Sequence, residues 1–137
     1  MNAFEGTVSF SSKDDSGERF DFLVPCTYQT DGENAVLSFI EPKGENDVAT
    51  RTRVYMGDGF LNIRRQGDMV ADFQFEENEK TELKYATAQG VLRFEIVTKK
   101  LDISFDDCSA LAKTEYDLYY QGEKTSSTKI EILVKKG

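Results

Sequence analysis

Hydrophobic and polar side chains take turns along much of the chain, and this period of two is typical of β-strands buried on one side only. In one such run the apolar residues Leu92, Phe94 and Ile96 alternate with Arg93 and Glu95. The same alternation occurs in residues 4–10, 20–24, 92–96, 101–106 and 129–135. Each run is predicted to form a strand with one face toward a core and the other toward water.

Turn signals separate the runs at short intervals, at residues 31–32, 42–47, 57–59, 66–68, 77–78, 89–90 and 121–122. Short loops join neighbouring strands as antiparallel hairpins, and an open sheet of so many strands would leave two edges and a wide apolar face. The sequence therefore predicts an all-β fold, a closed antiparallel up-and-down barrel of about 8–10 strands. Residues 1–137 are expected to form this single domain, with no more than a turn at 107–113.

The length and net charge of the chain limit the kinds of partner that it can bind. A chain of 137 residues with 39% hydrophobic content can bury one core without metals or disulfides. The net charge of −8 repels phosphate backbones and anionic membrane surfaces, so we expect no nucleic-acid or membrane partner. The first ten residues lack the features of a signal peptide, and we expect a cytoplasmic protein.

The residue types also limit the chemistry. The chain has no histidine and two distant cysteines, Cys26 and Cys108, which are expected to be reduced thiols, although a disulfide stays open at this point. We therefore expect no metal, no cofactor and no catalysis, because no nucleophile and base can be paired. The acidic clusters at 14–15, 76–79 and 106–107 fall in predicted turns and lack the spacing of a calcium loop.

A succession of motifs resembles a known family. The motifs are the Arg65-Gln66-Gly67 turn, the strand at 69–73, the run at 85–90, the corner at 98–101 and the strand Tyr116-Asp117-Leu118. In this order they resemble the YwiB-like proteins, small bacterial proteins of uncharacterised function described as calycin-like β-barrels. The resemblance covers about residues 55–136, whereas the first third matches only through its alternation and Tyr28. It implies a barrel of the kind that often holds a small molecule, and it implies no catalytic residue.

Arg65 is the most informative candidate residue. Side chains alternate faces along residues 61–65, so Arg65 points inward if Leu61 and Ile63 do, while Arg64 points to water. An inward guanidinium stays charged and needs acceptors. Either Arg65 binds a carboxylate or phosphate of a ligand, or it lies at the rim beside Gly67, where it bonds backbone carbonyls or reaches solvent.

The same alternation places hydroxyl groups on the predicted inner face. They belong to Tyr28, Tyr85, Thr87, Thr98, Tyr116 and Tyr120. With Arg65, these groups would line an amphiphilic lumen of the kind that binds small molecules. Alternatively, the tyrosines fill the core and each hydroxyl bonds a carbonyl or solvent.

Two hypotheses of function follow. The leading one is a barrel that binds a small, partly apolar, anionic ligand in a wide lumen, with Arg65 as its charge partner. The alternative is a non-catalytic interaction module or homodimer that uses the outer barrel face. It predicts that the outward apolar residues gather on one side, and these are Phe60, Val70, Val91, Val97, Leu133 and Tyr119. Outward Arg51, Arg53 and Arg64 would either dock an acidic partner or pair with acidic residues across strands.

Overall fold

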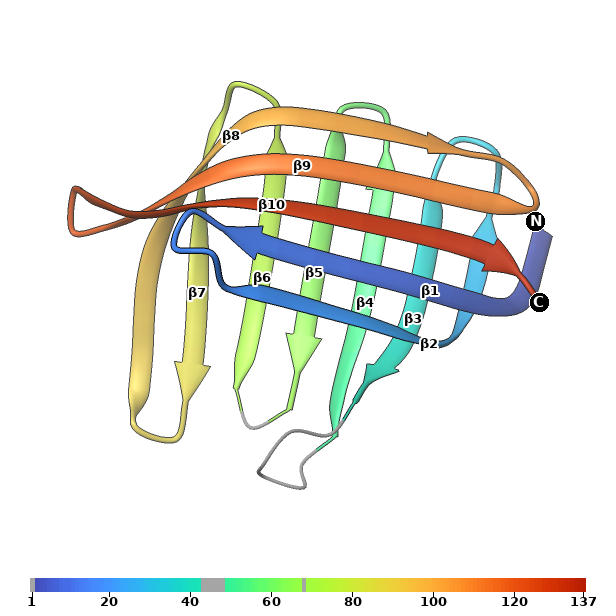
Figure 1. Cartoon of the computed structure of the whole chain (residues 1–137), viewed down its shortest axis with the longest axis horizontal. Helices are drawn as coiled ribbons and strands as arrows, with labels where there is room; N and C mark the ends of the chain where they lie inside the picture. Colours follow the sequence, from blue (N-terminus) through green and yellow to red (C-terminus); the bar gives the residue numbers. More distant parts are fainter. Residues whose placement is uncertain (1, 43–48, 68) are drawn as a thin grey trace.

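The computed structural model describes residues 2–42, 49–67 and 69–137, and within them the chain forms ten β-strands and no helix (Figure 1). The strands are β1 (Asn2–Asp14), β2 (Arg19–Thr30), β3 (Ala35–Glu41), β4 (Thr50–Gly57), β5 (Phe60–Gln66), β6 (Val70–Glu76), β7 (Lys80–Thr87), β8 (Gly90–Phe105), β9 (Ser109–Tyr120) and β10 (Glu123–Lys136). A short bend precedes β9 where a turn is expected.

Each strand pairs antiparallel with its neighbours in the sequence, and β1 also pairs with β10, which closes the barrel. At this seam Val8 lies opposite Val134, and the amide of Gly137 donates to the carbonyl oxygen of Glu5 at 3.1 Å. The all-β, closed, up-and-down barrel predicted from the alternation is therefore confirmed, at the upper end of the expected strand number.

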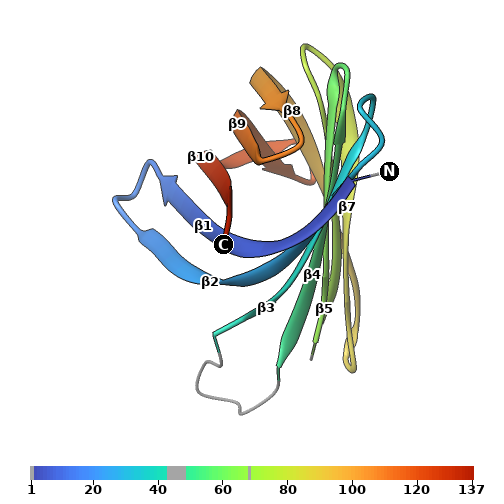
Figure 2. The same cartoon turned by 90° about the vertical axis from the view of Figure 1, so that its right-hand side faces the viewer.

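The barrel is flattened into two layers whose strands cross steeply (Figures 1 and 2). The front sheet contains β1, β2, β9, β10 and the second half of β8, and the back sheet contains β3 to β7 and the first half of β8. Strand β8 passes from one sheet to the other, with a register shift between Thr98 and Lys100. A bulge of this kind bends a strand, which lets one long strand serve both layers.

The core lies between the two sheets and fills the middle of the barrel. On β3 the residues Ala35, Leu37 and Phe39 point into the core and are buried. Ile40 points to the opposite face and is exposed. The fully buried side chains from both sheets include Val8, Leu37, Val54, Leu61, Phe75, Leu83, Ile96, Ile132 and Val134. The middle of the barrel is thus packed, in contrast to the wide, partly empty lumen that the leading hypothesis predicts.

One end of the barrel is less tightly closed. Strand β2 pairs with β1 from Arg19 onward, but β3 joins it only at Cys26. Figure 2 shows the β1–β2 hairpin extending away from β3 and β4 at this end. Inner-face side chains become accessible here, since Phe20 on β2 and Leu92 on β8 are each 48% exposed. We call this end the mouth of the barrel.

Candidate functional site

Arg65 lies on the inner face near the mouth, as the alternation predicts. Leu61 and Ile63 on the same strand are buried, whereas Arg64 faces solvent. The side chain of Arg65 is 33% exposed, so the guanidinium is neither fully buried nor free in water. Its neighbours decide what it can bind.

The guanidinium is held by Glu41 in a two-point ion pair. Nε of Arg65 donates to Oε2 of Glu41 and Nη2 donates to Oε1, both at 2.8 Å. The hydroxyl of Thr52 donates to the same Oε2 at 2.6 Å. Burial alone would lower the pKa of Arg65, but the hydrogen bonds and charge of Glu41 raise it, so the side chain stays a cation. Arg65 therefore bonds an internal carboxylate, a partner that neither sequence-based alternative named.

Cross-strand register explains why Tyr85 joins this pair. Thr52, Arg65, Ala71 and Tyr85 lie opposite one another on β4, β5, β6 and β7. The methyl group of Ala71 is small, which leaves space above β6 for the guanidinium and the tyrosine to approach each other. A hydrogen bond with Tyr85 also contributes to the raised pKa of Arg65.

Three of the four predicted tyrosines belong to one aromatic cluster beside Arg65. Tyr85 packs edge-on against Phe94 at 5.9 Å between ring centres, and Phe94 contacts Tyr120 at 5.2 Å. Tyr116 packs on Phe75 at 4.9 Å. Burial raises the pKa of Tyr116 to about 12, against the opposing effect of its hydrogen bond with Thr128.

A second aromatic cluster lies on the β1–β3 side of the mouth. Phe10 stacks on Phe22 at 5.1 Å, and Phe22 contacts Phe39 at 5.7 Å. Phe39 precedes Glu41 by two residues on the same face of β3. The Arg65–Glu41 pair is thus flanked by aromatic rings contributed by both halves of the barrel.

Two predicted site residues lie elsewhere and hold turns together. Tyr28 is 1% exposed, stacks on Phe4 at 4.6 Å, and donates its hydroxyl to the carbonyl oxygen of Asp106 at 2.9 Å. Thr87 donates to the carbonyl oxygen of Gly90 at 3.0 Å and so closes the β7–β8 hairpin. Neither residue lies beside Arg65. Tyr28 instead fits the alternative in which a tyrosine fills the core and its hydroxyl bonds a carbonyl group.

Sequence reasoning missed Glu41 and Thr52, although their signal was present. Glu41 continues the inward series Leu37 and Phe39, and Thr52 precedes Val54 in the same phase. Glu41 stands alone at the end of a predicted strand, outside the acidic clusters of the turns. Thr98, predicted on the inner face, is 1% exposed, and its hydroxyl has no hydrogen-bond partner among the described residues.

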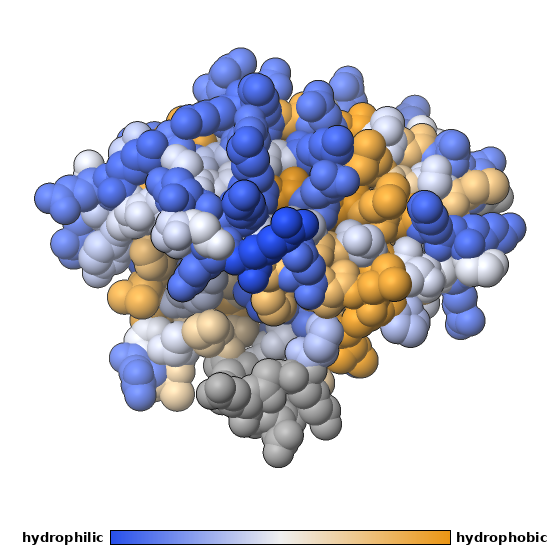
Figure 3. Space-filling view, in the orientation of Figure 1, coloured by the Kyte–Doolittle hydropathy of each residue, from blue (hydrophilic) through white to orange (hydrophobic). Residues whose placement is uncertain are grey.

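The outer surface carries charged and apolar groups of its own. Figure 3 shows hydrophobic side chains gathered to the right of centre on the front face. On the outer face of the front sheet, register places Leu23 and Leu133 on either side of Ser9, and Leu111 opposite Leu133. Val70 and Val91 lie on the outer face of the back sheet instead. The outward apolar residues are therefore divided between the two sheets.

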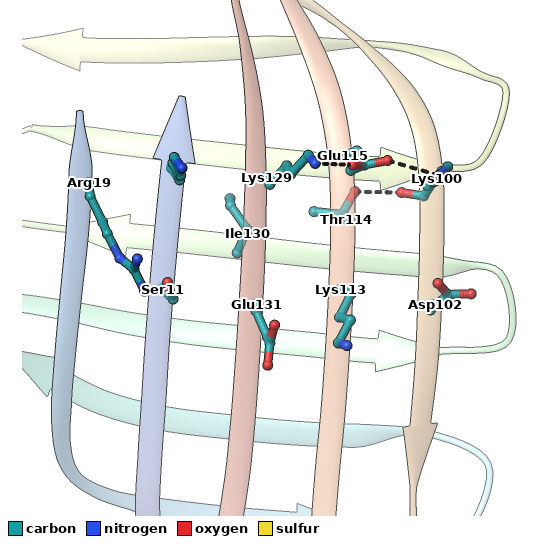
Figure 4. Close-up of a pocket in the computed structure, with 11 residues that line it drawn as sticks. Ser11, Arg19, Lys100, Asp102, Lys113, Thr114, Glu115, Lys129, Ile130 and Glu131 are labelled. Carbon is teal, nitrogen blue, oxygen red and sulfur yellow. Dashed lines mark hydrogen bonds and ion pairs between the residues drawn. The ribbon is translucent and has the colours of Figure 1, made fainter. Parts of the chain in front are cut away.

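A shallow depression of about 300 Å³ lies beside this patch on the front sheet (Figure 4). Several lysines line it, but Glu115 lies 3.1 Å from the Lys129 amine and 3.5 Å from the Lys100 amine. The hydroxyl of Thr114 donates to the carbonyl oxygen of Lys100 at 3.0 Å. Cations and carboxylates alternate across these strands, an arrangement that stabilises a sheet surface without requiring a ligand.

The two cysteines and the acidic residues of the turns lie outside this site. Cys26 is buried and Cys108 exposed, and both are free thiols. The Ser16 hydroxyl, followed by backbone amides of the same turn, donates to Asp14 and lowers the pKa of that carboxyl group. The backbone amides of Cys108 and Ser109 lower the pKa of Asp106 in the same way. The described part of the chain contains no group of three or more potential metal ligands. Nor does it contain a helix long and apolar enough to cross a lipid bilayer.

Comparisons with known proteins agree with the architecture. The crystal structure of the ywiB protein from Bacillus subtilis superposes with a TM-score of 0.81 at 20% identity, covering 99% of this chain and 92% of that one. At this identity the likeness concerns the fold. No curated protein matches the chain. Residues 6–132 match the family described as a domain of unknown function, DUF1934. The chain therefore belongs to the DUF1934 family.

Proposed function

We propose that the protein binds a small, partly apolar molecule at the mouth of the barrel, with an anionic or hydrogen-bond-accepting group on Arg65. The observation that carries this proposal is the half-buried Arg65–Glu41 pair between two aromatic clusters. A charged pair costs desolvation wherever water is removed, and replacing such a pair by apolar side chains is often neutral or stabilising. Its position at an accessible mouth supports a role in recognition.

The guanidinium retains binding capacity beyond Glu41. An arginine has five N–H donors, and Glu41 accepts from two nitrogens, Nε and Nη2. The side chain is one-third exposed, so its outer edge can be reached from the mouth. A carboxylate or another acceptor on a ligand would bond this edge while Glu41 keeps the guanidinium in place.

The walls of the mouth favour the apolar part of such a ligand. Phe20 is 48% exposed on one side and Leu92 is 48% exposed on the other. Burying this surface against a ligand provides roughly 25 cal/mol per Å². Since the middle of the barrel is packed, the ligand would lie between the two aromatic clusters rather than deep in the lumen.

The pairing also argues for binding rather than catalysis. Glu41 accepts hydrogen bonds from Arg65 and from the hydroxyl of Thr52. The carboxylate is therefore already bonded on both oxygens and is poorly placed to act as a base. Because Glu41 balances the charge of Arg65, the mouth is suited to a singly charged or neutral acceptor more than to a highly charged phosphate. The ligand class is accordingly an amphiphile with one polar head.

Fluorescence titration with anilinonaphthalene sulfonate, an aromatic probe with one anionic group, tests the proposal. Loss of one charge-assisted contact in Arg65→Gln should weaken probe binding by about 10-fold or more. Arg64→Gln removes the same charge one residue away on the outer face and should leave binding unchanged. Medium-chain carboxylates should compete with the probe.

Equal probe affinity in the wild type and in Arg65→Gln would refute the proposal. Near-ultraviolet circular dichroism of each variant shows whether its core remains packed. A variant with a loosened core could bind the probe there instead of at the mouth. In that case Tyr85→Phe, which keeps the ring and removes the hydroxyl beside Arg65, provides a second variant. It should weaken binding to a smaller extent than Arg65→Gln.

A further inference from the structure

A row of charged side chains crosses the outer face of the back sheet. Register places Arg53 on β4 opposite Arg64 on β5, and Arg64 opposite Asp72 on β6. Asp72 lies opposite Lys84, and Lys84 opposite Arg93 on β8. Four of these five residues are cations in a chain whose net charge is −8. Like charges placed directly opposite, as Arg53 and Arg64 are, destabilise a sheet.

Within the described residues, the cations of this row form few ion pairs. Among the described residues, Arg53, Arg64 and Arg93 form no ion pair, and the amine of Lys84 lies 3.9 Å from its nearest carboxylate, Glu82. This differs from the front-sheet depression, where carboxylates contact the lysines directly. In the part of the chain that the structure describes, Arg51, Arg53 and Arg64 form none of the cross-strand ion pairs that are one alternative for them.

An apolar row runs parallel to the charged one. It lies two residues away from the charged row on each strand, and Val70, Ala86 and Val91 are its contiguous apolar part. Arg51 and Gln66 separate these three residues from Ile40 at the far end of the row. Ile40 is 53% exposed, Val70 is 37% exposed and Val91 is 56% exposed. We call the two rows together the basic face. It combines solvent-facing cations with exposed aliphatic side chains.

The basic face continues into a concave surface at the β3–β4 end. Arg53 lies opposite Ser38, and Ser38 lies opposite Thr27 on β2. These three residues, with Glu5 and Val36, line a depression of about 640 Å³. A segment lying along the row would have room to enter this depression.

We propose that the basic face binds an acidic amphipathic helix of a partner protein. Adjacent strands lie about 4.8 Å apart, close to the helical pitch of about 5.4 Å, so acidic residues one turn apart would meet the cations on β4, β5, β7 and β8. A neutral helix residue would lie over Asp72 on β6. The neighbouring edge of the helix would place apolar residues on Ile40, Val70 and Val91. Five strands span about 19 Å, the length of about 13 helical residues.

Charge favours this occupant over nucleic acid or lipid. The chain as a whole carries −8, which repels an extended polyanion or an anionic bilayer beyond the edges of the face. A single helix contacts only the basic face and avoids that repulsion. This inference is independent of the proposed ligand, because Arg64 and Arg65 are consecutive residues on opposite faces of β5.

Fluorescence anisotropy with a labelled model peptide tests the inference. The probe is a helix of about 15 residues with glutamates on one edge and leucines on the next, compared with a scrambled peptide of the same composition. The double variant Arg53→Gln, Arg64→Gln should bind the helical probe at least about 10-fold more weakly. Val91→Ser should weaken it less, and raising NaCl from about 0.05 M to about 0.3 M should weaken it in the wild type.

Two controls separate recognition from structure. Arg19→Gln removes an exposed arginine of the front sheet and should bind the probe like the wild type. The double variant should unfold at the same urea concentration as the wild type or a higher one, because a like-charge contact is removed. A clear loss of stability would show that the arginines serve the fold and would overturn the proposal.

Other results would also overturn it. They are equal binding of the helical and scrambled peptides, tighter binding of a DNA duplex or of phosphatidylglycerol vesicles, and a dimer in sedimentation that the double variant abolishes. The last result would assign the basic face to a second copy of the chain.

Discussion

Glu41 and Arg65 face each other across β4, and Thr52 on that intervening strand bonds the carboxylate that the arginine also holds. The pair joins residues 24 positions apart and lies at the accessible end of an otherwise apolar interior. Its geometry has a direct consequence for stability.

Replacing Glu41 by Gln should destabilise the fold by about 2 kcal/mol, because the half-buried Arg65 would lose its counter-charge. The double variant Glu41→Leu, Arg65→Met should lie within about 1 kcal/mol of the wild type, since no uncompensated charge remains. Urea unfolding of both variants checks this. Glu95→Gln, which breaks an exposed pair with Lys80, is the matched control and should change little. A Glu41→Gln protein as stable as the wild type would contradict the prediction.

The raised pKa of Tyr116 leads us to predict that the folded protein loses stability in alkali. Its pKa is about 12 in the folded chain, against an ordinary value of 10.0. The unfolded chain therefore releases this proton first, and stability falls as the pH rises from about 10 through about 12, by about 2–3 kcal/mol in total. Unfolding free energies measured across this range should show the slope in the wild type and a shallower one in Tyr116→Phe. Parallel curves for the two proteins would argue against the burial of the hydroxyl.

The lowered pKa of Asp117 leads us to predict that the folded protein loses stability in acid. Burial alone would raise its pKa, but the Ser127 hydroxyl at 2.6 Å and the amines of Lys99 and Lys124 lower it below the ordinary value of 3.8. The ionised carboxylate thus stabilises the fold above pH about 4, and this contribution is lost as the pH falls through the lowered pKa.

Asp117→Asn should cost about 1–2 kcal/mol at neutral pH, and its stability should converge with that of the wild type in acid. Thermal unfolding at a series of pH values measures both effects. Asp102→Asn removes an exposed carboxylate from the adjacent β8 and serves as the control. A constant difference between Asp117→Asn and the wild type at every pH would exclude the ionisation as the cause.

The alternation of side chains was sufficient to predict the barrel, because a period of two assigns each residue to a face before any partner is known. It placed Arg65 inside and Arg64 outside, as in the structure. The end of each strand was harder to predict, since β8 continues through a bulge at Thr98 to Lys100 that no hydrophobic pattern marks.

The site depends on distances between strands, which a single sequence does not contain. Glu41 could be placed on the inner face by its phase with Phe39, but its contact with Arg65 follows from the order and register of β3, β4 and β5. Tyr28 shows the opposite case. Its phase is inward, yet its hydroxyl bonds Asp106, 78 residues away, at a turn that only the closed barrel brings near.

The seam between β1 and β10 sets the order in which this protein can mature. Segments from opposite ends of the sequence must meet there, so the largest loop-closure entropy is associated with the last contact to form. Until β10 is synthesised, β1 presents a bare edge that another nascent chain could occupy. Assembly in the cell is therefore a competition between sealing the molecule and exchanging strands with a neighbour.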